Sequence, residues 1–327
     1  MARGPLYAQD YRPQFSGHET FPMKYGWLKK AVDAVRESES LEANRSVFLD
    51  EDAIGNFGVG KNMVTAIRYW SESVGMITPA DASGRIEVTP LGRLIFGEEG
   101  LDPFMESAAT SWLAHWRLCG RPDRTTWYWA FGYLSETDFE REGLLRSLMG
   151  LVKDRKWPRI SEATVKRDVD CFIRSYASRP SMSAGTHEDT LESPLVELGL
   201  IRAIGRKDGF RMVRGSKPTL GPGVFLYALL DFWERYSHSA ATRRNSLSFE
   251  AIAYEPGSPG RVFLLDEADL SDRLADLEDF TDGALMWSET AGLKQVLRRR
   301  EIDEAEALAL VAGDFADANA GEVEYAA

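Results

Sequence analysis

Apolar residues recur at the period of one helical face in the segment 57–77. Their spacing of four, three and four residues predicts an amphipathic helix over 61–75. The residues of this predicted buried face are Met63, Ile67, Trp70 and Val74. Gly58 and Gly60 come just before the helix and suit a tight turn, because glycine adopts backbone angles that are closed to other residues. Together with a short helix expected over 50–56, the pattern predicts a helix-turn-helix unit, whose second helix reads DNA.

The same pattern predicts a wing after this unit. Arg85–Thr89 alternates polar and apolar residues, which is typical of a short strand. Thr89 and Pro90 have the character of an N-cap and a first-turn proline, so another helix is expected to begin there. With a first helix over 31–43, we interpret residues 31–97 as a winged helix-turn-helix.

A second unit of the same kind is predicted farther along the chain. Helices are expected over 138–153 and 160–176, and Ser161 supplies an N-cap for the second of them. Two apolar runs at 201–204 and 210–213 flank an Asp-Gly pair, which predicts a β-hairpin.

This second hairpin is strongly basic. Residues 202–217 contain six bases and one acid. A basic hairpin that follows a helix-turn-helix suits contacts with DNA phosphates. A hairpin that is merely solvated is the alternative, and the sequence leaves it open.

These elements predict a mainly α fold with short β-hairpin wings, in which two winged helix-turn-helix-like units belong to a helical multidomain protein. We expect an N-terminal domain over 1–100 and a helical domain with the second helix-turn-helix over 101–240. A small C-terminal helical module with an acidic tail is expected over 241–327. Within it, the run 262–265 is predicted as a short strand, and the last dozen residues are poor in core-forming side chains.

The chain has 327 residues and a net charge of −12, which at first argues against binding to nucleic acid. The acidity is local, because residues 266–282 hold eight acids and one base and residues 301–327 hold eight acids and no base. These stretches are net −7 and −8, so the rest of the chain is net +3 and is free to bind an anionic polymer. The acidic stretches are either solvated helix faces or, for the tail, a competitor of DNA for a basic surface.

Composition also bears on the compartment. No apolar run approaches the length of a membrane span, and the first residues lack the apolar centre of a secretory signal. The two cysteines, Cys119 and Cys171, do not suggest a disulfide framework. We therefore expect a cytoplasmic protein without a membrane partner.

The glycine turn has a second interpretation. Gly55–Asn62 departs at one position from the phosphate-binding loop G-x-x-x-x-G-K-[S/T], because Asn62 stands where a hydroxyl would bind Mg²⁺. Such a loop follows a buried strand, but the preceding segment 49–54 carries three carboxylates. An apolar run that ends in Asp266 and Glu267 could supply acidic partners. The helix-turn-helix interpretation is favoured over this nucleotide hydrolase.

Polar residues that lie off the buried faces are the candidate contacts with duplex DNA. In the first unit, Asn62 can pair with adenine through two hydrogen bonds and Arg68 with guanine. In the second unit, bases on the helix and on the hairpin can reach phosphates. The predicted DNA-binding residues are Lys61, Asn62, Thr65, Arg68, Lys166, Arg167, Arg206, Lys207 and Arg211.

Four motifs resemble a known bacterial family, domain of unknown function 4007. They are FSGHETF (15–21), YGWLKK (25–30), GVGKNMVTAIRYW (58–70) and WLAHWRL (112–118), in an order that covers most of residues 15–290. That family includes the DNA-nicking component of a single-strand DNA phosphorothioation system (Ssp). The resemblance implies a DNA-binding, Mg²⁺-assisted nickase that acts with a cysteine desulfurase and an ATPase in antiviral defence. Family members in other gene settings leave the system itself open.

Candidate chemistry lies in the first of these motifs. His18 can act as a general base, and Glu19 can bind a divalent cation such as Mg²⁺ or Mn²⁺ that relieves charge on the reacting phosphate. The alternative for His18 is a structural hydrogen bond within an aromatic pocket. Asp50 and Asp52 are weaker metal candidates, because acids at a helix N-terminus also complement its dipole. His115 lies in an apolar run and is interpreted as a core histidine.

Two classes of function are therefore consistent with the sequence. One is a DNA nicking endonuclease built on winged-helix readers, and the other is a non-catalytic winged-helix DNA-binding adaptor or regulator. The favoured class is the enzyme, with duplex DNA as its partner; a homodimer is left open. The sequence shows no established nuclease motif that would separate the two.

Overall fold

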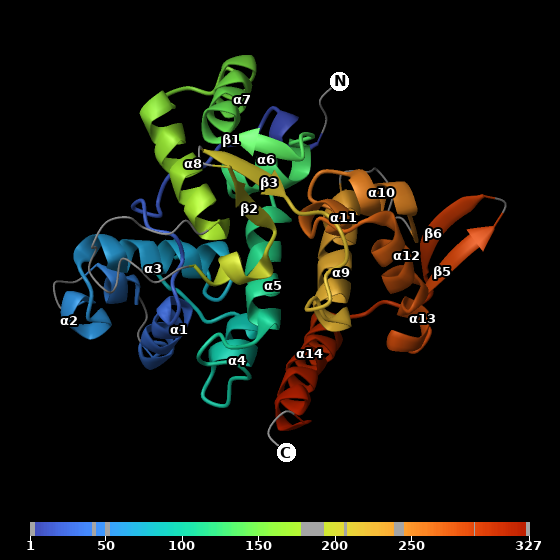
Figure 1. Ribbon diagram of the computed structural model, residues 1–327. Helices are drawn as coiled ribbons and strands as arrows, with labels where there is room; N and C mark the ends of the chain where they lie inside the picture. The colour runs from blue at the N-terminus through green and yellow to red at the C-terminus, as the bar shows by residue number, and fades with distance from the viewer. Residues whose placement is uncertain are drawn as a thin grey trace.

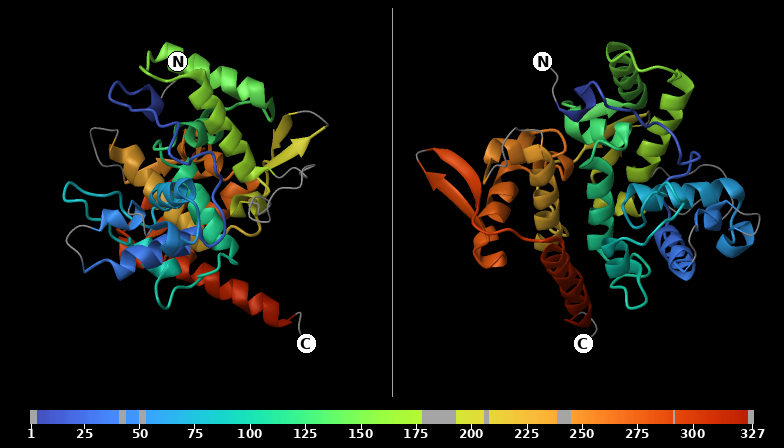
Figure 2. Two further views of the ribbon diagram at one scale, coloured as in Figure 1. Left: turned by 90° about the vertical axis from the view of Figure 1, so that its left-hand side faces the viewer. Right: turned by 180° about the vertical axis from the view of Figure 1, so that it is seen from behind.

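Helices make up most of the fold, and two small antiparallel sheets complete it (Figure 1). The computed structural model describes residues 4–40, 44–49, 53–177, 193–205, 208–238, 245–290 and 292–324. Helices α5 (Ala108–Cys119) and α9 (Pro222–His238) stand side by side at the centre, and the other elements surround them (Figures 1 and 2). The expected mainly α fold is thus confirmed.

The N-terminal helices form the first group. Their bounds are α1 Trp27–Glu37, α2 Ala53–Phe57, α3 Lys61–Ser73 and α4 Pro90–Phe96, with 3-10 turns η1 Pro5–Tyr7 and η2 Arg45–Phe48. The helix–glycine turn–helix is confirmed, since Gly58 has a φ of 65° between α2 and α3. Thr89 caps α4 as expected, because its side chain accepts the Gly92 N–H at 3.0 Å. The predicted face of α3 is buried fully at Ile67, Trp70 and Val74 and partly at Met63.

The hairpin after α3 is not a pair of regular strands. Ile77 and Val88 form a single antiparallel bridge outside the named strands. At Ile86 the backbone N–H and C=O both bond to the amide of the buried Asn44 side chain, at 2.7 and 2.9 Å. The Asn44 amide thus takes the place of a neighbouring strand on one edge. On the other edge the Glu87 N–H donates to the Thr78 hydroxyl at 2.9 Å and not to a backbone carbonyl, so the strand predicted over Arg85–Thr89 does not form a regular ladder.

The central group carries the first sheet. It comprises α5, α6 Thr125–Tyr133, β1 Asp138–Glu140, α7 Arg141–Asp154, α8 Glu162–Tyr176, η4 Pro194–Leu198, β2 Ile201–Ile204 and β3 Gly209–Met212. The expected hairpin of β2 and β3 is confirmed, and Ser161 caps α8 by accepting the Thr164 N–H at 3.2 Å. The helix expected from residue 138 is wrong at its start. Residues 138–140 form β1, because Phe139 is buried opposite Phe210 of β3 in a sheet of order β1-β3-β2.

The C-terminal group packs against α9. It comprises β4 Ser246–Ser248, α10 Phe249–Tyr254, α11 Pro259–Val262, α12 Glu267–Ala275, α13 Leu277–Phe280, β5 Leu285–Thr290, β6 Leu293–Arg298 and α14 Glu304–Glu324. The strand predicted over 262–265 is wrong, since Val262 ends α11 and the buried run continues in a turn. The second sheet, of order β4-β6-β5, was not predicted. Its β5–β6 hairpin projects from the body of the protein (Figures 1 and 2).

The acidic tail is largely a structural helix. The side chains of Val311 and Phe315 of α14 are buried, and the helix packs along α9. Asp314 accepts the N–H groups of Gly223 and Val224 at 3.0 and 2.7 Å, so its carboxylate satisfies the free N-terminus of α9. Val311 and Phe315 precede the last dozen residues, whose predicted lack of core-forming side chains stays a prediction.

One continuous apolar cluster runs through all three groups. It includes buried residues from Phe15 to Phe315 and draws on each of the three predicted domains. The domain boundaries at residues 100 and 240 stay a prediction. In the described part of the chain, no helix combines the length and the apolar character needed to cross a membrane.

Candidate nucleic-acid interface

His18 lies inside the protein, between α3 and α8. Its side chain is 3% exposed, and its Nε2 lies 2.9 Å from Oδ1 of Asp168 on α8. The N–H of Thr20 donates to Nδ1 at 3.0 Å. Because Nδ1 accepts a hydrogen bond, the neutral ring carries its proton on Nε2 and donates it to the Asp168 carboxylate. Both ring nitrogens are therefore engaged inside the protein.

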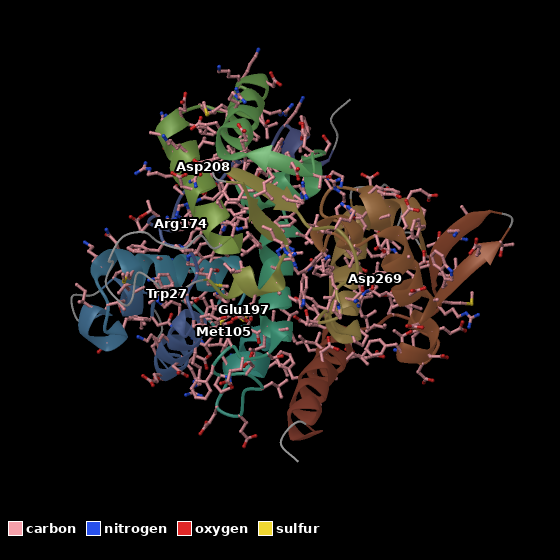
Figure 3. All side chains as sticks on the ribbon, viewed as in Figure 1. Trp27, Met105, Arg174, Glu197, Asp208 and Asp269 are labelled. Atoms are coloured by element: carbon pink, nitrogen blue, oxygen red, sulfur yellow. The ribbon has the colours of Figure 1, made fainter. Side chains whose placement is uncertain are left out.

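Residues 15–21 tie α3 to α8, and we call them the clamp loop. The indole of Trp70 on α3 donates to the Phe21 carbonyl at 3.0 Å, and Arg174 on α8 donates to the Thr20 carbonyl. Gly17 has a φ of 118°, and a Cβ there would lie 2.5 Å from the ring of Tyr69. The close approach of the loop to α3 thus depends on glycine. Figure 3 labels Arg174 where α8 approaches the N-terminal helices.

Aromatic rings enclose the buried histidine, as the structural alternative for His18 predicted. The His18 ring centroid lies 5.8 Å from that of Tyr69, 6.4 Å from Trp70 and 6.2 Å from Trp127. Asp168 is 1% exposed, and its Oδ2 has no hydrogen-bond partner among the described residues. A buried carboxylate with so few partners depends strongly on His18.

Asp168 was missed by the sequence interpretation, although a signal exists. It lies on the apolar face of α8 with Val165 before it and Phe172 after it, at helical spacing. A charged residue in the middle of a buried face must find a partner. The sequence could not name that partner, because His18 is 150 residues away.

Glu19 faces solvent, in contrast to its neighbour. The residue is exposed and has a φ of 48°, and Thr20 follows with a φ of 67°. This left-handed turn directs His18 inward and leaves Glu19 outside. The structure does not bring these two predicted site residues together on the surface.

The described side chains do not form a ready metal site. No group of three His, Cys, Asp or Glu residues among them could hold a metal ion. Asp50 and Asp52 lie outside the described residues. Glu19 is thus the one predicted metal ligand whose place the structure gives, and by itself it does not fit a resident Mg²⁺, which binds through one or two carboxylates completed by water and substrate phosphate.

The first turn of α3 presents three of the predicted DNA contacts together. Lys61, Asn62 and Thr65 are all exposed there. Arg68 differs, because its Nε donates to Glu72 Oε1 at 2.7 Å and its charge is shared with that carboxylate. The free polar surface of α3 is therefore its N-terminal end.

The second unit contains exposed bases without an ion pair and one base that is held by a carboxylate. Lys166 and Arg167 on α8 are exposed and form no ion pair with any described residue. Arg211 on β3 is held by Asp138 through two hydrogen bonds of 2.6 and 2.7 Å, and this bonding raises the pKa of the Arg211 guanidinium. Arg206 and Lys207 lie outside the described residues.

Two further bases of the second unit were missed by the sequence interpretation. Lys156 and Arg159 lie in the turn between α7 and α8, with left-handed φ values of 55° and 61°. Both are exposed and form no ion pair within the described chain. Their signal is the run RKWPRI (155–160), which is basic and contains a proline between two helices.

The alternative phosphate-binding loop lacks its structural context. Residues 55–62 run from α2 through the turn into α3, and the 3-10 turn η2 stands where the described chain would need a strand. Asp266 caps α12 by accepting the Asp269 N–H at 2.8 Å, and Glu267 accepts the hydroxyl of Tyr254. These two acids therefore have local structural roles.

The core histidine and the cysteines are buried away from solvent. His115 Nε2 donates to the Val262 carbonyl and Nδ1 accepts from the Tyr176 hydroxyl, each at 2.8 Å, and burial lowers the pKa of the ring to about 3. The interpretation of His115 as a core residue is confirmed. Burial also raises the pKa of the Cys119 and Cys171 thiols, so neither is a thiolate at neutral pH.

Comparison with known proteins gives one consistent result over nearly the whole chain. None of the curated proteins matches the sequence. Two crystal structures of SspB, one of them magnesium ion-bound, are similar to this chain with a TM-score of 0.75. The magnesium ion-bound structure is 30% identical and the other 31%, and each alignment covers 94% of this chain and 88% of that chain. The model of the protein family of unknown function DUF4007 matches residues 15–312, and the chain therefore belongs to that family.

Proposed function

We propose that this protein binds duplex DNA and nicks one strand, as the nicking component of an Ssp-type DNA phosphorothioation and phage-defence system. The observation that carries the proposal is the similarity to SspB along 94% of the chain at 30% identity. The four motifs that resemble the nickase family lie within residues 15–312, the range that the family model matches. The clamp loop is the first of these motifs.

The topology of the central group supports DNA binding. Strand β1 precedes α7 and α8, the β2–β3 hairpin follows them, and the sheet order is β1-β3-β2. In a winged helix-turn-helix of this arrangement, the second helix enters the major groove and the hairpin lies along the backbone. We assign α8 as the second helix and the β2–β3 hairpin as the wing. The first unit repeats the device with α2, α3 and the narrow hairpin after α3.

The free bases supply the electrostatic part of the interface. Exposed Lys61, Lys166 and Arg167 form no ion pair with described residues, so phosphates can displace only counterions from them. Asn62 has no such charge and is placed to read a base edge at the start of α3. Arg68 and Arg211 must first leave their carboxylate partners, and we give them a smaller part.

A divalent cation, Mg²⁺ or Mn²⁺, is part of the proposal. One of the similar SspB structures is magnesium ion-bound. When bound, such an ion would neutralise charge on the phosphate that is cut. Glu19 is exposed at the clamp loop, and DNA phosphates would have to complete the coordination that this single carboxylate begins.

The contacts of His18 in the structure support a different role from the general base that the sequence suggested. A general base needs an open nitrogen within reach of the attacking water. Both ring nitrogens of His18 are engaged, so its contacts support a positioning role for the clamp loop. Its role as a general base stays a prediction, which requires that the loop rearranges on DNA.

Duplex DNA is the proposed partner of the exposed bases. The resemblance adds a cysteine desulfurase and an ATPase of the same system, and a homodimer is left open. The alternative function, a non-catalytic DNA-binding adaptor or regulator, is supported by the lack of a ready metal site among the described residues.

A plasmid assay tests the enzyme directly. Supercoiled DNA is incubated with the protein in Mg²⁺, Mn²⁺ or EDTA, and we expect open circular product only with a divalent ion. Glu19→Gln should slow nicking by a factor of about 10²–10⁴ if its carboxylate acts in the reaction. Glu98→Gln, at another exposed acid, is the matched control. Binding of DNA without any nick in either metal would establish the adaptor instead.

A further inference from the structure

A cavity of about 680 Å³ lies outside the clamp loop and the two DNA-reading helices. It is formed by η1, α6, α9 and the segment after α10, and four aromatic side chains line it. They are Tyr7, Tyr128, Phe232 and Tyr236. We propose that this cavity binds the planar base of a nucleotide. Its volume is in the range of small-molecule sites, about 300–1,000 Å³.

The aromatic walls are held in place before any ligand arrives. Phe232 and Tyr236 are one turn apart on α9, and their rings stack with centroids 5.3 Å apart and planes 28° apart. The Tyr128 hydroxyl donates to the Pro256 carbonyl at 2.9 Å, and the Tyr7 ring meets Tyr133 edge-on at 5.8 Å. Tyr128 and Phe232 are almost fully buried, so the ring faces that a flat ligand can reach are those of the half-buried Tyr7 and Tyr236. Stacking on rings that are already ordered costs little conformational entropy.

Two polar groups line the cavity with opposite hydrogen-bonding character. Arg235 shares a face of α9 with Phe232, and its Nε–H is buried without a partner among the described residues. Glu255 contributes a carboxylate, which can only accept when ionised. A nucleobase presents acceptors and amino donors side by side along its edge, so it can satisfy both groups.

The charge next to the cavity suits the phosphate that a nucleotide carries. Asp231 is contacted by Arg121 and by Arg235, the latter at 3.2 Å. Burial alone would raise the pKa of the Asp231 carboxyl, but Arg235, Arg121 and Arg117 together lower it. Three guanidinium groups around one carboxylate leave an excess of positive charge.

A second cavity of about 730 Å³ adjoins the first. Pro5 and Ala8 line both, and the second also has the guanidinium groups of Arg12, Arg117 and Arg124, together with three carboxylates. The lining of the second cavity therefore carries no net charge. A base in the aromatic cavity can direct its sugar past Pro5 and Ala8 into this space.

The base can come from two sources, namely a free nucleotide or a nucleotide of bound DNA. In the second case the inference rests on the proposed DNA binding. The fluorescent base 2-aminopurine separates the sources, because stacking on tyrosine or phenylalanine rings changes its emission. One arm of the experiment titrates 2-aminopurine nucleoside monophosphate, and the other titrates single-stranded and duplex oligonucleotides that contain one 2-aminopurine.

We expect a saturable change of emission in at least one arm. Tyr236→Leu should weaken it by at least about tenfold, whereas Tyr236→Phe keeps the ring and should bind within about twofold of the wild type. Tyr254→Leu, the same change at a half-exposed tyrosine of α10 outside the cavity, is the matched control. Thermal unfolding of each variant verifies the fold, and gel retardation of unlabelled duplex reports the proposed DNA binding separately.

Each outcome decides the inference. A response to the monophosphate assigns the cavity to free nucleotides, and a response only to oligonucleotides assigns it to a base of DNA. No saturable change in either arm overturns the inference, even if duplex retardation is normal. Equal weakening by Tyr236→Leu and Tyr236→Phe, or none by either, also overturns it, because a stacking site must distinguish an aromatic from an aliphatic side chain.

Discussion

The two helix-turn-helix-like units differ in how they support the helix to which we assign DNA binding. In the first unit, α3 rests on α1 and α2, and one asparagine, Asn44, stands in for a strand at the hairpin. In the second, α8 belongs to a group with a true three-stranded sheet. The first unit thus has a small wing fixed by a side chain, and the second a wing fixed by a ladder.

The units differ in charge as well. The first exposes Lys61 beside the uncharged Asn62, and its Arg68 is paired with Glu72. The second exposes several bases without ion pairs in the described chain, among them Lys156, Arg159, Lys166 and Arg167. This difference teaches that the units need not act alike, and we infer that the second supplies most phosphate contacts while the first reads bases.

The largest expected effect comes from the residue that joins the units. His18→Ala removes the described hydrogen-bond partner of Asp168, which is 1% exposed. Leaving a buried charge without its partner costs about 3–5 kcal/mol, so the free energy of unfolding should fall by that amount. Urea denaturation measures the change.

Two controls define this result. Asp168→Asn keeps an oxygen that accepts from His18 Nε2, and it should cost less than His18→Ala. Glu19→Ala, at the exposed neighbour, should change the free energy of unfolding by no more than about 0.5 kcal/mol. A His18→Ala protein as stable as Glu19→Ala would show that the clamp loop does not hold α8 to α3.

Acid should loosen the second unit through His115. This residue bonds to Tyr176 at the end of α8, and burial lowers its pKa from 6.5 to about 3. Because the folded pKa is depressed, the unfolded chain takes up a proton first, and stability is lost as pH falls below 6.5. The loss should reach about 2 kcal/mol at pH 5. Denaturation at pH 7 and pH 5 measures this loss of unfolding free energy. His115→Gln should remove the part of the pH dependence that comes from His115. An identical pH dependence in the variant would assign the acid sensitivity to other groups.

The charge difference between the units predicts unequal salt dependence of DNA binding. Lys166→Gln combined with Arg167→Gln should flatten the slope of log K against log salt by about 1.8, since each phosphate contact contributes about 0.9. Arg211→Gln should change the slope less, because Asp138 already holds that guanidinium. Fluorescence anisotropy at several salt concentrations gives the slopes. Equal effects from the pair and from Arg211 would mean that Asp138 releases Arg211 to DNA.

Local signals predicted a large part of this architecture. The glycine turn before α3, the Ser161 cap and the Asp-Gly hairpin each involve residues within one element or its neighbour, so the sequence displays them directly. Strand β1 could not be found this way. It has three residues, and its partner strand β3 comes about 70 residues later, so only the folded sheet makes it a strand.

The candidate site was predicted less well, for the same reason. The sequence placed His18 and Glu19 in one motif, but it could not show that one points inward and the other outward. That difference depends on left-handed backbone angles at Glu19 and Thr20 and on Asp168, 150 residues away. A pattern of residue types could therefore mark the loop as a candidate, whereas the orientation of each side chain depends on contacts that only tertiary structure supplies.

The smallest expected effect concerns the acidic end of α14. Deleting residues 317–327 removes three carboxylates that follow Phe315, a buried side chain of α14. We expect the free energy of unfolding to change by no more than about 0.5 kcal/mol. Affinity for duplex DNA should rise by a few fold at most, and the gain should shrink as added salt shortens the screening length from about 10 Å at 0.1 M.

Asp314→Ala is the informative comparison, because it also removes one negative charge from α14 but leaves the N-terminus of α9 uncapped. That variant should lose about 0.5–2 kcal/mol of stability. If the deletion destabilises the protein as much as Asp314→Ala does, the end of the helix supports the fold; if it leaves DNA affinity unchanged at low salt, the tail does not compete with DNA for the bases of either unit.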